Sequence, residues 1–81
     1  MTLNSLKKII KYRSTYSGTK ETDILYKKYF IDNLDKFTEN ELELLKSVLD
    51  FYSDDEIYDI LLKKTPVNTR FINLFKKINT I

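Results

Sequence analysis

An 81-residue chain is long enough for one domain but not for two, and 42% hydrophobic with 32% charged residues is typical of a globular protein. The chain has no cysteine and no histidine, which excludes disulfides, thiolate metal sites and cysteine nucleophiles and removes the usual general base, so we do not expect an enzyme. A net charge of +2 does not by itself indicate nucleic-acid binding, and no apolar run approaches the length of a membrane span.

The scarcity of turn residues predicts an all-helical fold. The chain has one glycine and one proline, whereas β-hairpins and sandwiches use these residues in their turns. We therefore predict an all-α fold, a compact single-domain bundle of five short helices. The helices are expected over about residues 4–16, 19–34, 38–52, 53–64 and 68–79.

The first predicted helix ends at a break around Gly18. The inward stripe of this helix is formed by Leu6, Ile9 and Ile10. Gly18 can adopt a positive φ without a Cβ clash and so end the helix at its C′ position, while the Thr19 hydroxyl can cap the next helix. Glu21 and Asp23 then fall in the first turn of the second helix, where the helix dipole favours carboxylates.

The second and third helices follow from apolar spacing and one capping signal. The inward face of the second helix is predicted to carry Ile24, Leu25, Tyr29, Phe30 and Leu34. Thr38 and Glu41 have the spacing of a capping box, so the third helix should begin at Thr38. The cleanest amphipathic stripe in the chain follows it: Leu42, Leu45, Val48 and Leu49. We therefore expect the third helix to be the central one of the core.

Two shorter helices complete the predicted bundle. Ser53 and Glu56 form a second capping box, which starts a fourth helix. The apolar residues of the fourth helix are Ile57, Ile60 and Leu61. Pro66 bars continuation and marks a loop to about Asn68. The apolar face of the fifth helix is predicted to consist of Phe71, Leu74, Phe75 and Ile78.

Two kinds of charged cluster have a functional and a structural interpretation. Asp54, Asp55 and Glu56 could bind a hard cation, but acids are common in the first turn of a helix. The lysine pairs at 7–8, 27–28, 63–64 and 76–77 could contact phosphates, but they are spread over separate helices. We interpret the acids as a helix start and most of the lysines as solvated faces.

The break around Gly18 also has two interpretations. A glycine followed three positions later by a glutamate lets a partner's backbone approach closely and places a carboxylate to receive its hydrogen-bond donors. Alternatively, Gly18 is only a helix cap and Glu21 only a complement to the dipole. The chemistry of these residues alone leaves both interpretations open.

The N-terminal segment is basic and also has two interpretations. The first 20 residues carry five basic side chains and no acid, which is the composition of a mitochondrial transit peptide. The apolar spacing in this segment serves equally well as the buried stripe of a first helix. A transit peptide is therefore the alternative to the helix that we predict here.

The order of residues along the chain resembles a known family. The matching residues are Arg13-Ser14, Gly18-Thr19-Lys20-Glu21-x-Asp23-Ile24-Leu25, Leu34-x-x-Phe37-Thr38-x-x-Glu41, Asp54-x-Glu56-Ile57-Tyr58-x-Ile60-Leu61 and Pro66. This order is similar to that of the small succinate dehydrogenase assembly factors, the flavinators that promote covalent attachment of FAD to the flavoprotein subunit. The resemblance covers roughly residues 5–66, with about one inserted residue near Phe51–Ser53, and implies a compact five-helix bundle.

The family signature is Arg-Gly-x-x-Glu on an exposed surface that docks on the flavoprotein. Gly18 and Glu21 match this signature, whereas Ser17 stands where the arginine is expected. Arg13 or Lys20 could supply a cation instead, although neither places a guanidinium fork at that position. Ile60 replaces the family's usual tryptophan in a segment that we interpret as packing.

The resemblance implies a positioning role rather than catalysis. Members of the family bind the immature flavoprotein and hold its FAD and acceptor histidine in a geometry in which the flavoprotein flavinylates itself. FAD then belongs to the client, and we expect no cofactor to be bound stably. The residues implied to bind the partner are Arg13, Tyr16, Ser17, Gly18, Lys20, Glu21 and Asp23.

The expected client is the flavoprotein subunit of succinate dehydrogenase, with a fumarate reductase-type flavoprotein as a further candidate. We expect a monomer when free, in the bacterial cytoplasm or alternatively in the mitochondrial matrix, with no membrane insertion and no nucleic-acid partner. Two other functions remain as alternatives: an antitoxin-like or other protein-binding helical module, and a small nucleic-acid-binding domain.

Overall fold

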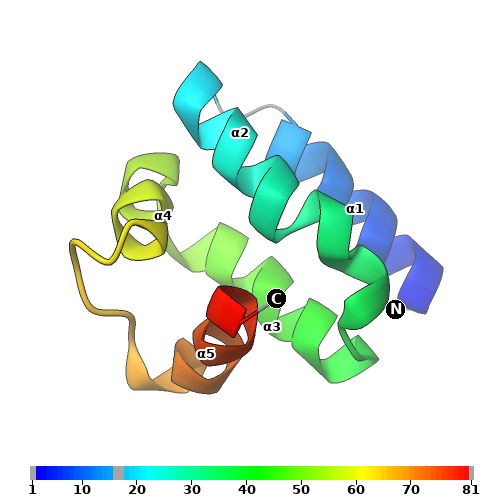
Figure 1. Ribbon diagram of the computed structural model, residues 1–81. Helices are drawn as coiled ribbons and strands as arrows, with labels where there is room; N and C mark the ends of the chain where they lie inside the picture. The colour runs from blue at the N-terminus through cyan, green and yellow to red at the C-terminus, as the bar shows by residue number, and fades with distance from the viewer. Residues whose placement is uncertain (1, 16–17, 81) are drawn as a thin grey trace.

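The computed structural model describes residues 2–15 and 18–80, and these residues form helices and connecting segments without any strand (Figure 1). The α-helices within this part of the chain are α1 (Leu3–Thr15), α2 (Lys20–Tyr29), α3 (Glu39–Phe51), α4 (Asp54–Leu61) and α5 (Ile72–Thr80). Two short 3-10 helices precede α3 and α5: η1 (Ile31–Lys36) and η2 (Thr69–Phe71). The predicted all-α bundle of five helices is confirmed.

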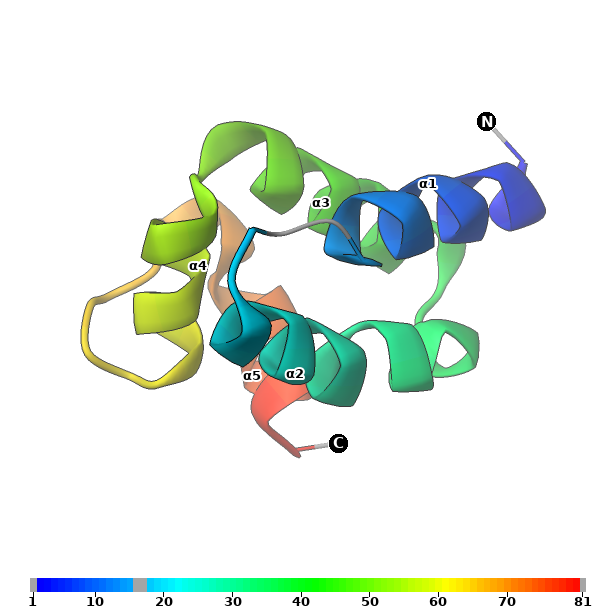
Figure 2. The ribbon, with the colours of Figure 1, turned by 90° about the horizontal axis from the view of Figure 1, so that it is seen from above.

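The helices pack around α3. In both views α1 and α2 lie side by side and run in opposite directions (Figures 1 and 2). α3 packs against α1 and also against α5, while α4 packs against α2 (Figure 1). This arrangement brings the start of α2 and the start of α4 close together, although the two are far apart in the sequence.

The core confirms the predicted apolar stripes of α3, α4 and the final segment. Leu42, Leu45 and Val48 are fully buried, and Leu49 is nearly so. Further buried residues come from α4, η2 and α5 as predicted: Ile57, Ile60, Leu61, Phe71, Leu74, Phe75 and Ile78. From α1, Leu6 and Ile10 join them, while Ile9 is half-buried.

Both predicted capping boxes are present. The Thr38 hydroxyl accepts the Glu41 amide at 3.2 Å, and the Glu41 carboxylate accepts the Thr38 amide at 2.8 Å. Ser53 and Glu56 repeat this exchange at 3.3 and 3.0 Å. The first amides of a helix have no acceptor inside the helix, and at the starts of α3 and α4 these side chains supply one.

The predicted single helix over 19–34 is wrong. α2 ends at Tyr29, and the chain continues as the 3-10 helix η1. The Asn33 side chain is buried and donates hydrogen bonds to the carbonyl oxygens of Lys28 at 2.8 Å and Tyr29 at 3.4 Å. Such a side-chain donor satisfies carbonyls at the helix end and stabilises the tighter turn.

The predicted inward face of α2 is also partly wrong. Ile24 is 58% exposed, whereas Tyr26, which the stripe omitted, is fully buried together with Phe30. The buried face therefore follows Thr22, Tyr26 and Phe30 at intervals of one helical turn. This face lies toward α1 and α4, where the Tyr26 hydroxyl finds a hydrogen-bond acceptor.

α4 is shorter than the predicted 53–64, because it ends at Leu61. Lys63 has a positive φ of 62°, and its amide donates to the Ile60 carbonyl at 3.0 Å. The Lys64 amide donates to the Asp59 carbonyl at 2.8 Å. These two bonds form the Schellman motif that closes many helices, here with lysine at the position that glycine usually occupies.

Truncation of the central core residue should destabilise the fold strongly. Because Leu45 is fully buried on α3, Leu45→Ala leaves a cavity and should cost about 2–5 kcal/mol of unfolding free energy. A thermal melt followed by circular dichroism should show a fall of the order of 10 °C or more in Tm. Leu3→Ala, at a leucine that is 41% exposed, is the control and should change Tm much less. Equal shifts for the two variants would contradict the orientation of α3.

A second stability prediction concerns pH. The Lys77 ammonium donates to the Glu41 carboxylate at 2.6 Å, and this bond, followed by the one from the Thr38 amide, lowers the pKa of Glu41. A carboxyl pKa that is lower in the folded state stabilises the fold above its unfolded value of about 4.3, and the stabilisation is lost as pH falls through the folded value. Glu41→Gln should therefore lower the unfolding free energy at pH 7 by up to about 1 kcal/mol, with a matching fall in Tm, and should lower both much less at pH 3.

The matched control is Glu43→Gln, which removes the same charge from an exposed carboxylate that has no ion pair within the described part of the chain. Melts of both variants over pH 3–8 measure the effect. A Glu41→Gln deficit that does not shrink toward acidic pH would show that the ion pair is not its source.

Candidate partner-binding site

The turn between α1 and α2 is open to solvent at Gly18. Gly18 has a φ of +89°, and a Cβ added there would meet no atom within 4 Å. The glycine is therefore explained by the backbone conformation and not by crowding from its neighbours. The predicted positive φ is confirmed, whereas Tyr16 and Ser17 lie outside the described residues.

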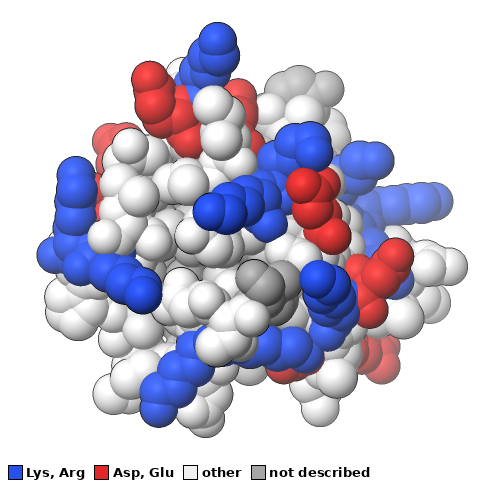
Figure 3. All heavy atoms as spheres, in the orientation of Figure 1, with Lys and Arg blue, Asp and Glu red and all other residues white. Residues whose placement is uncertain are grey.

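Thr19 starts α2 as predicted. Its hydroxyl accepts the Thr22 amide at 3.3 Å and donates to the Thr22 hydroxyl at 2.7 Å. This cap fixes the direction in which Lys20 and Glu21 leave the turn, and both of these side chains are exposed. Figure 3 shows basic and acidic side chains side by side at the top of the molecule, over the start of α2. We call residues 18–21 the docking turn.

A shallow pocket of about 400 Å³ lies between the docking turn and α4. Glu21 lines it from α2, and Asp55 and Tyr58 line it from α4. Both acids sit in the first turn of their helices, where a negative charge complements the helix dipole. The pocket can therefore receive hydrogen-bond donors and cations.

The structure separates two acids that the sequence grouped together. Asp23 does not line the pocket with Glu21; it lines a second hollow of about 350 Å³ with Ser14, Lys27 and Ile31, on the side of α2 that meets α1. The pocket beside Glu21 is lined instead by Asp55 and Tyr58 of α4. Sequence spacing gave no sign of this pairing, because residues 21 and 55 come together only when α4 packs on α2.

A partly buried hydrogen bond helps to hold α4 beside the docking turn. The Tyr26 hydroxyl donates to the Asp54 carboxylate at 2.8 Å, joining α2 to the start of α4. Burial raises the pKa of Tyr26 far above its usual value, and the bond to Asp54 raises it further. The hydroxyl therefore remains a neutral hydrogen-bond donor at any physiological pH.

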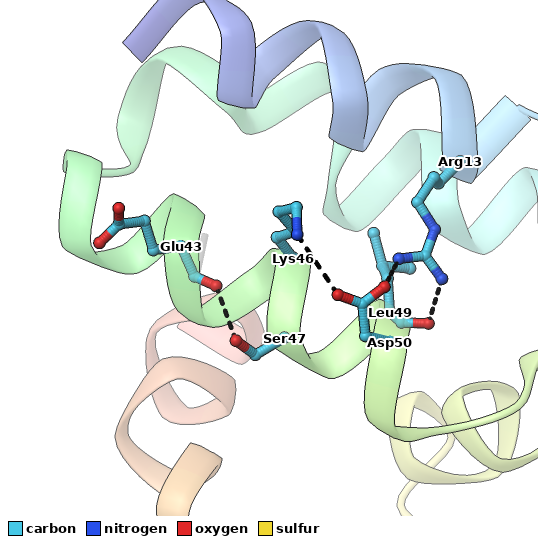
Figure 4. A network of polar contacts seen from close by, with 6 residues as sticks. All are labelled: Arg13, Glu43, Lys46, Ser47, Leu49 and Asp50. Carbon is cyan, nitrogen blue, oxygen red and sulfur yellow. Dashed lines mark hydrogen bonds and ion pairs between the residues drawn. The ribbon is translucent and has the colours of Figure 1, made fainter. Parts of the chain in front are cut away.

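Arg13 faces α3 (Figure 4). Its guanidinium donates to the Asp50 carboxylate and to the Leu49 carbonyl, and Lys46 lies 3.4 Å from the other Asp50 oxygen. Although partial burial raises the pKa of Asp50, the hydrogen bond and charge of Arg13 lower it on balance. Arg13 thus fastens the end of α1 to the end of α3.

Within the described residues, no three histidine, cysteine, aspartate or glutamate side chains form a group that could hold a metal ion. None of the helices in those residues combines the length and apolar character that a membrane crossing needs. The fold and the site define a small all-helical protein that presents an exposed turn beside two acidic helix starts.

The comparison with protein families assigns this chain to a family. A family model described as "Flavinator of succinate dehydrogenase" matches residues 8–81, so the protein belongs to this family of succinate dehydrogenase assembly factors. The match confirms the resemblance found in the sequence and extends it to the C-terminal helix. No curated protein and no solved structure matches the chain.

Loss of the Tyr26 hydroxyl should loosen α4 without leaving a cavity. Tyr26→Phe removes the bond to Asp54 and should cost about 1–2 kcal/mol, since bonds to charged groups contribute more than neutral ones. Tyr29→Phe is the control, because the half-buried Tyr29 hydroxyl has no hydrogen bond within the described residues. Thermal melts compare the two, and equal Tm values would contradict a structural role for the Tyr26–Asp54 bond.

Proposed function

We propose that this protein binds the flavoprotein subunit of succinate dehydrogenase and promotes covalent attachment of FAD to it. The family supports the target, and the geometry of the docking turn supports the place of contact. The observation that carries the proposal is Gly18, which has a positive φ and open space where a side chain would project, with the exposed Glu21 in the adjoining helical turn.

Each part of the docking turn suits a task in binding. The missing side chain at Gly18 lets a partner's backbone come close, and the Glu21 carboxylate can accept hydrogen bonds from it. Asp55 and Tyr58 enlarge this acceptor surface from the α4 side of the pocket. A client surface that presents backbone amides together with a lysine or arginine would complement it.

The cation of the family signature needs another source here, because Ser17 replaces the arginine. The Arg13 guanidinium is engaged by Asp50 and Leu49, so its use in docking would break the fastening of α1 to α3. Lys20 is exposed within the docking turn itself. We therefore assign the cation to Lys20, which supplies a point charge without the fork of a guanidinium.

In this proposal the protein acts by positioning. It binds the flavoprotein conformer in which FAD and the acceptor histidine are close, raises the population of that conformer, and leaves the covalent step to the client. FAD belongs to the client, and the free protein is a monomer. The protein acts where the flavoprotein subunit matures, in the bacterial cytoplasm or the mitochondrial matrix, and a fumarate reductase-type flavoprotein is a second client.

Removal of the Glu21 charge should separate function from stability. Glu21→Gln should change the unfolding free energy by only about 0.3–1 kcal/mol, the contribution of an exposed first-turn carboxylate. Client flavinylation should fall about tenfold or more, since a charged acceptor is lost from the contact. The measurement is in-gel flavin fluorescence of the flavoprotein subunit in cells that lack the native protein and carry each variant at matched level.

Glu39→Gln is the matched control, because Glu39 is also an exposed glutamate in the first turn of a helix, but of α3. It should support normal flavinylation. Normal flavinylation with a stable Glu21→Gln protein would overturn the docking turn as the contact surface. Normal flavinylation in cells without the protein would overturn the proposed function itself.

A further inference from the structure

Another hollow, separate from the two described above, lies at the end of α4 that is remote from the docking turn. It has a volume of about 320 Å³ and is bounded by the end of α4, the connection that follows it and one side of α5. We call it the lysine groove, and its lining residues are Ile60, Lys63, Lys64, Thr65, Pro66, Val67, Phe75 and Asn79. The connection that forms its rim loops out at the left of Figure 1, between α4 and α5.

The lysine groove has an apolar floor and a basic rim. Ile60 and Phe75 are buried beneath it, and Pro66 and Val67 add apolar surface from the connection. Lys63 and Lys64 are exposed on the rim, and neither forms an ion pair with any carboxylate of the described residues. On this side of the molecule Figure 3 shows several basic side chains over the α4–α5 connection.

Asp59 is the acid closest in sequence to the two lysines. It does not line the groove, and the Lys64 amide bonds to its backbone carbonyl rather than to its side chain. The positive charge on the rim is therefore not neutralised locally. A shallow groove with apolar walls and uncompensated cations favours a ligand that carries both an apolar group and an anion.

The backbone at Lys63 supports a role for its side chain. The positive φ of 62° is less favourable for lysine than for glycine, and the Schellman bonds at this position would form equally well with glycine. Lysine therefore costs stability here in comparison with glycine, while it places an ammonium on the groove's rim. A lysine at a position where glycine would be less strained points to a role for the lysine side chain.

We propose that the lysine groove binds a segment of a partner protein in which a carboxylate neighbours a large apolar side chain. The apolar side chain contacts Ile60, Val67 and Phe75, and the carboxylate lies between the ammonium groups of Lys63 and Lys64. The lining residues of this groove and of the docking-turn pocket do not overlap, so both surfaces can be occupied at once. The proposal does not depend on the identity of the docking turn's client.

The test uses the whole protein and a defined peptide. The probe is a fluorescein-labelled Ser-Gly-Asp-Glu-Leu-Phe peptide, compared with Ser-Gly-Asn-Gln-Leu-Phe and with Ser-Gly-Asp-Glu-Ala-Ala, and binding is followed by fluorescence anisotropy. The acidic apolar peptide should bind with a Kd between about 10 μM and 1 mM, about tenfold tighter than either comparison peptide. When the protein binds the unlabelled peptide, the changes in the protein's amide NMR shifts should concentrate at residues 60–67 and 75–79.

The variant Lys63→Gln/Lys64→Gln should weaken binding of the acidic apolar peptide about tenfold. Lys8→Gln/Lys11→Gln is its matched control: it removes the same charge from two exposed lysines of α1 and should change Kd less than twofold. Lys63→Gly should raise Tm by relieving the backbone strain and should still weaken binding of the acidic apolar peptide. This result would separate the role of the side chain from its effect on folding.

Three results would overturn the proposal. The first is absence of binding by the acidic apolar peptide up to about 1 mM, the weak end of the expected range. The second is an equal loss of affinity in the α1 control, which would mean attraction by net charge alone. The third is binding of phosphatidylglycerol vesicles through Lys63 and Lys64 without any binding of the peptide, which would assign the groove to a membrane surface.

Discussion

Burial of one face of α3 is the contact on which the rest of the structure depends. Leu42, Leu45 and Val48 are fully buried, and α1 and α5 both pack on this helix. A chain of 81 residues forms only one small core, so its stability margin is narrow and no second cluster can replace the first. The capping boxes at the starts of α3 and α4 fix where these helices begin, and so where their apolar faces point.

Beyond this core, two polar links hold the helices that flank the proposed docking surface. Arg13 fastens the end of α1 to the end of α3, and Tyr26 joins α2 to Asp54 at the start of α4. The end of α1 and the start of α2 are thus both anchored to neighbouring helices. Gly18 and Glu21 are exposed, but the elements on either side of them are held, which lowers the entropy lost when a partner docks.

α4 gives the two proposed surfaces opposite charge. Its first turn carries Asp54, Asp55 and Glu56, and Lys63 and Lys64 follow its end, the distribution that the helix dipole favours. The acidic end borders the docking turn, and the basic end borders the lysine groove. Under the two proposals, this short helix with unlike ends serves two partner segments of opposite charge.

The sequence by itself determined the features that depend on neighbours within about one helical turn. The α3 stripe, both capping boxes and the positive φ of Gly18 follow from residue types spaced one to four positions apart, and the family signature could be recognised at Gly18 and Glu21. Only the tertiary structure decided which face of α2 is buried, because Ile24, Leu25 and Tyr26 offer several apolar faces and the choice is made by the packing of α2 on α1 and α4. Packing likewise placed Asp55 beside Glu21 and turned Asp23 toward α1, since contacts between residues far apart in the chain leave no trace in local spacing.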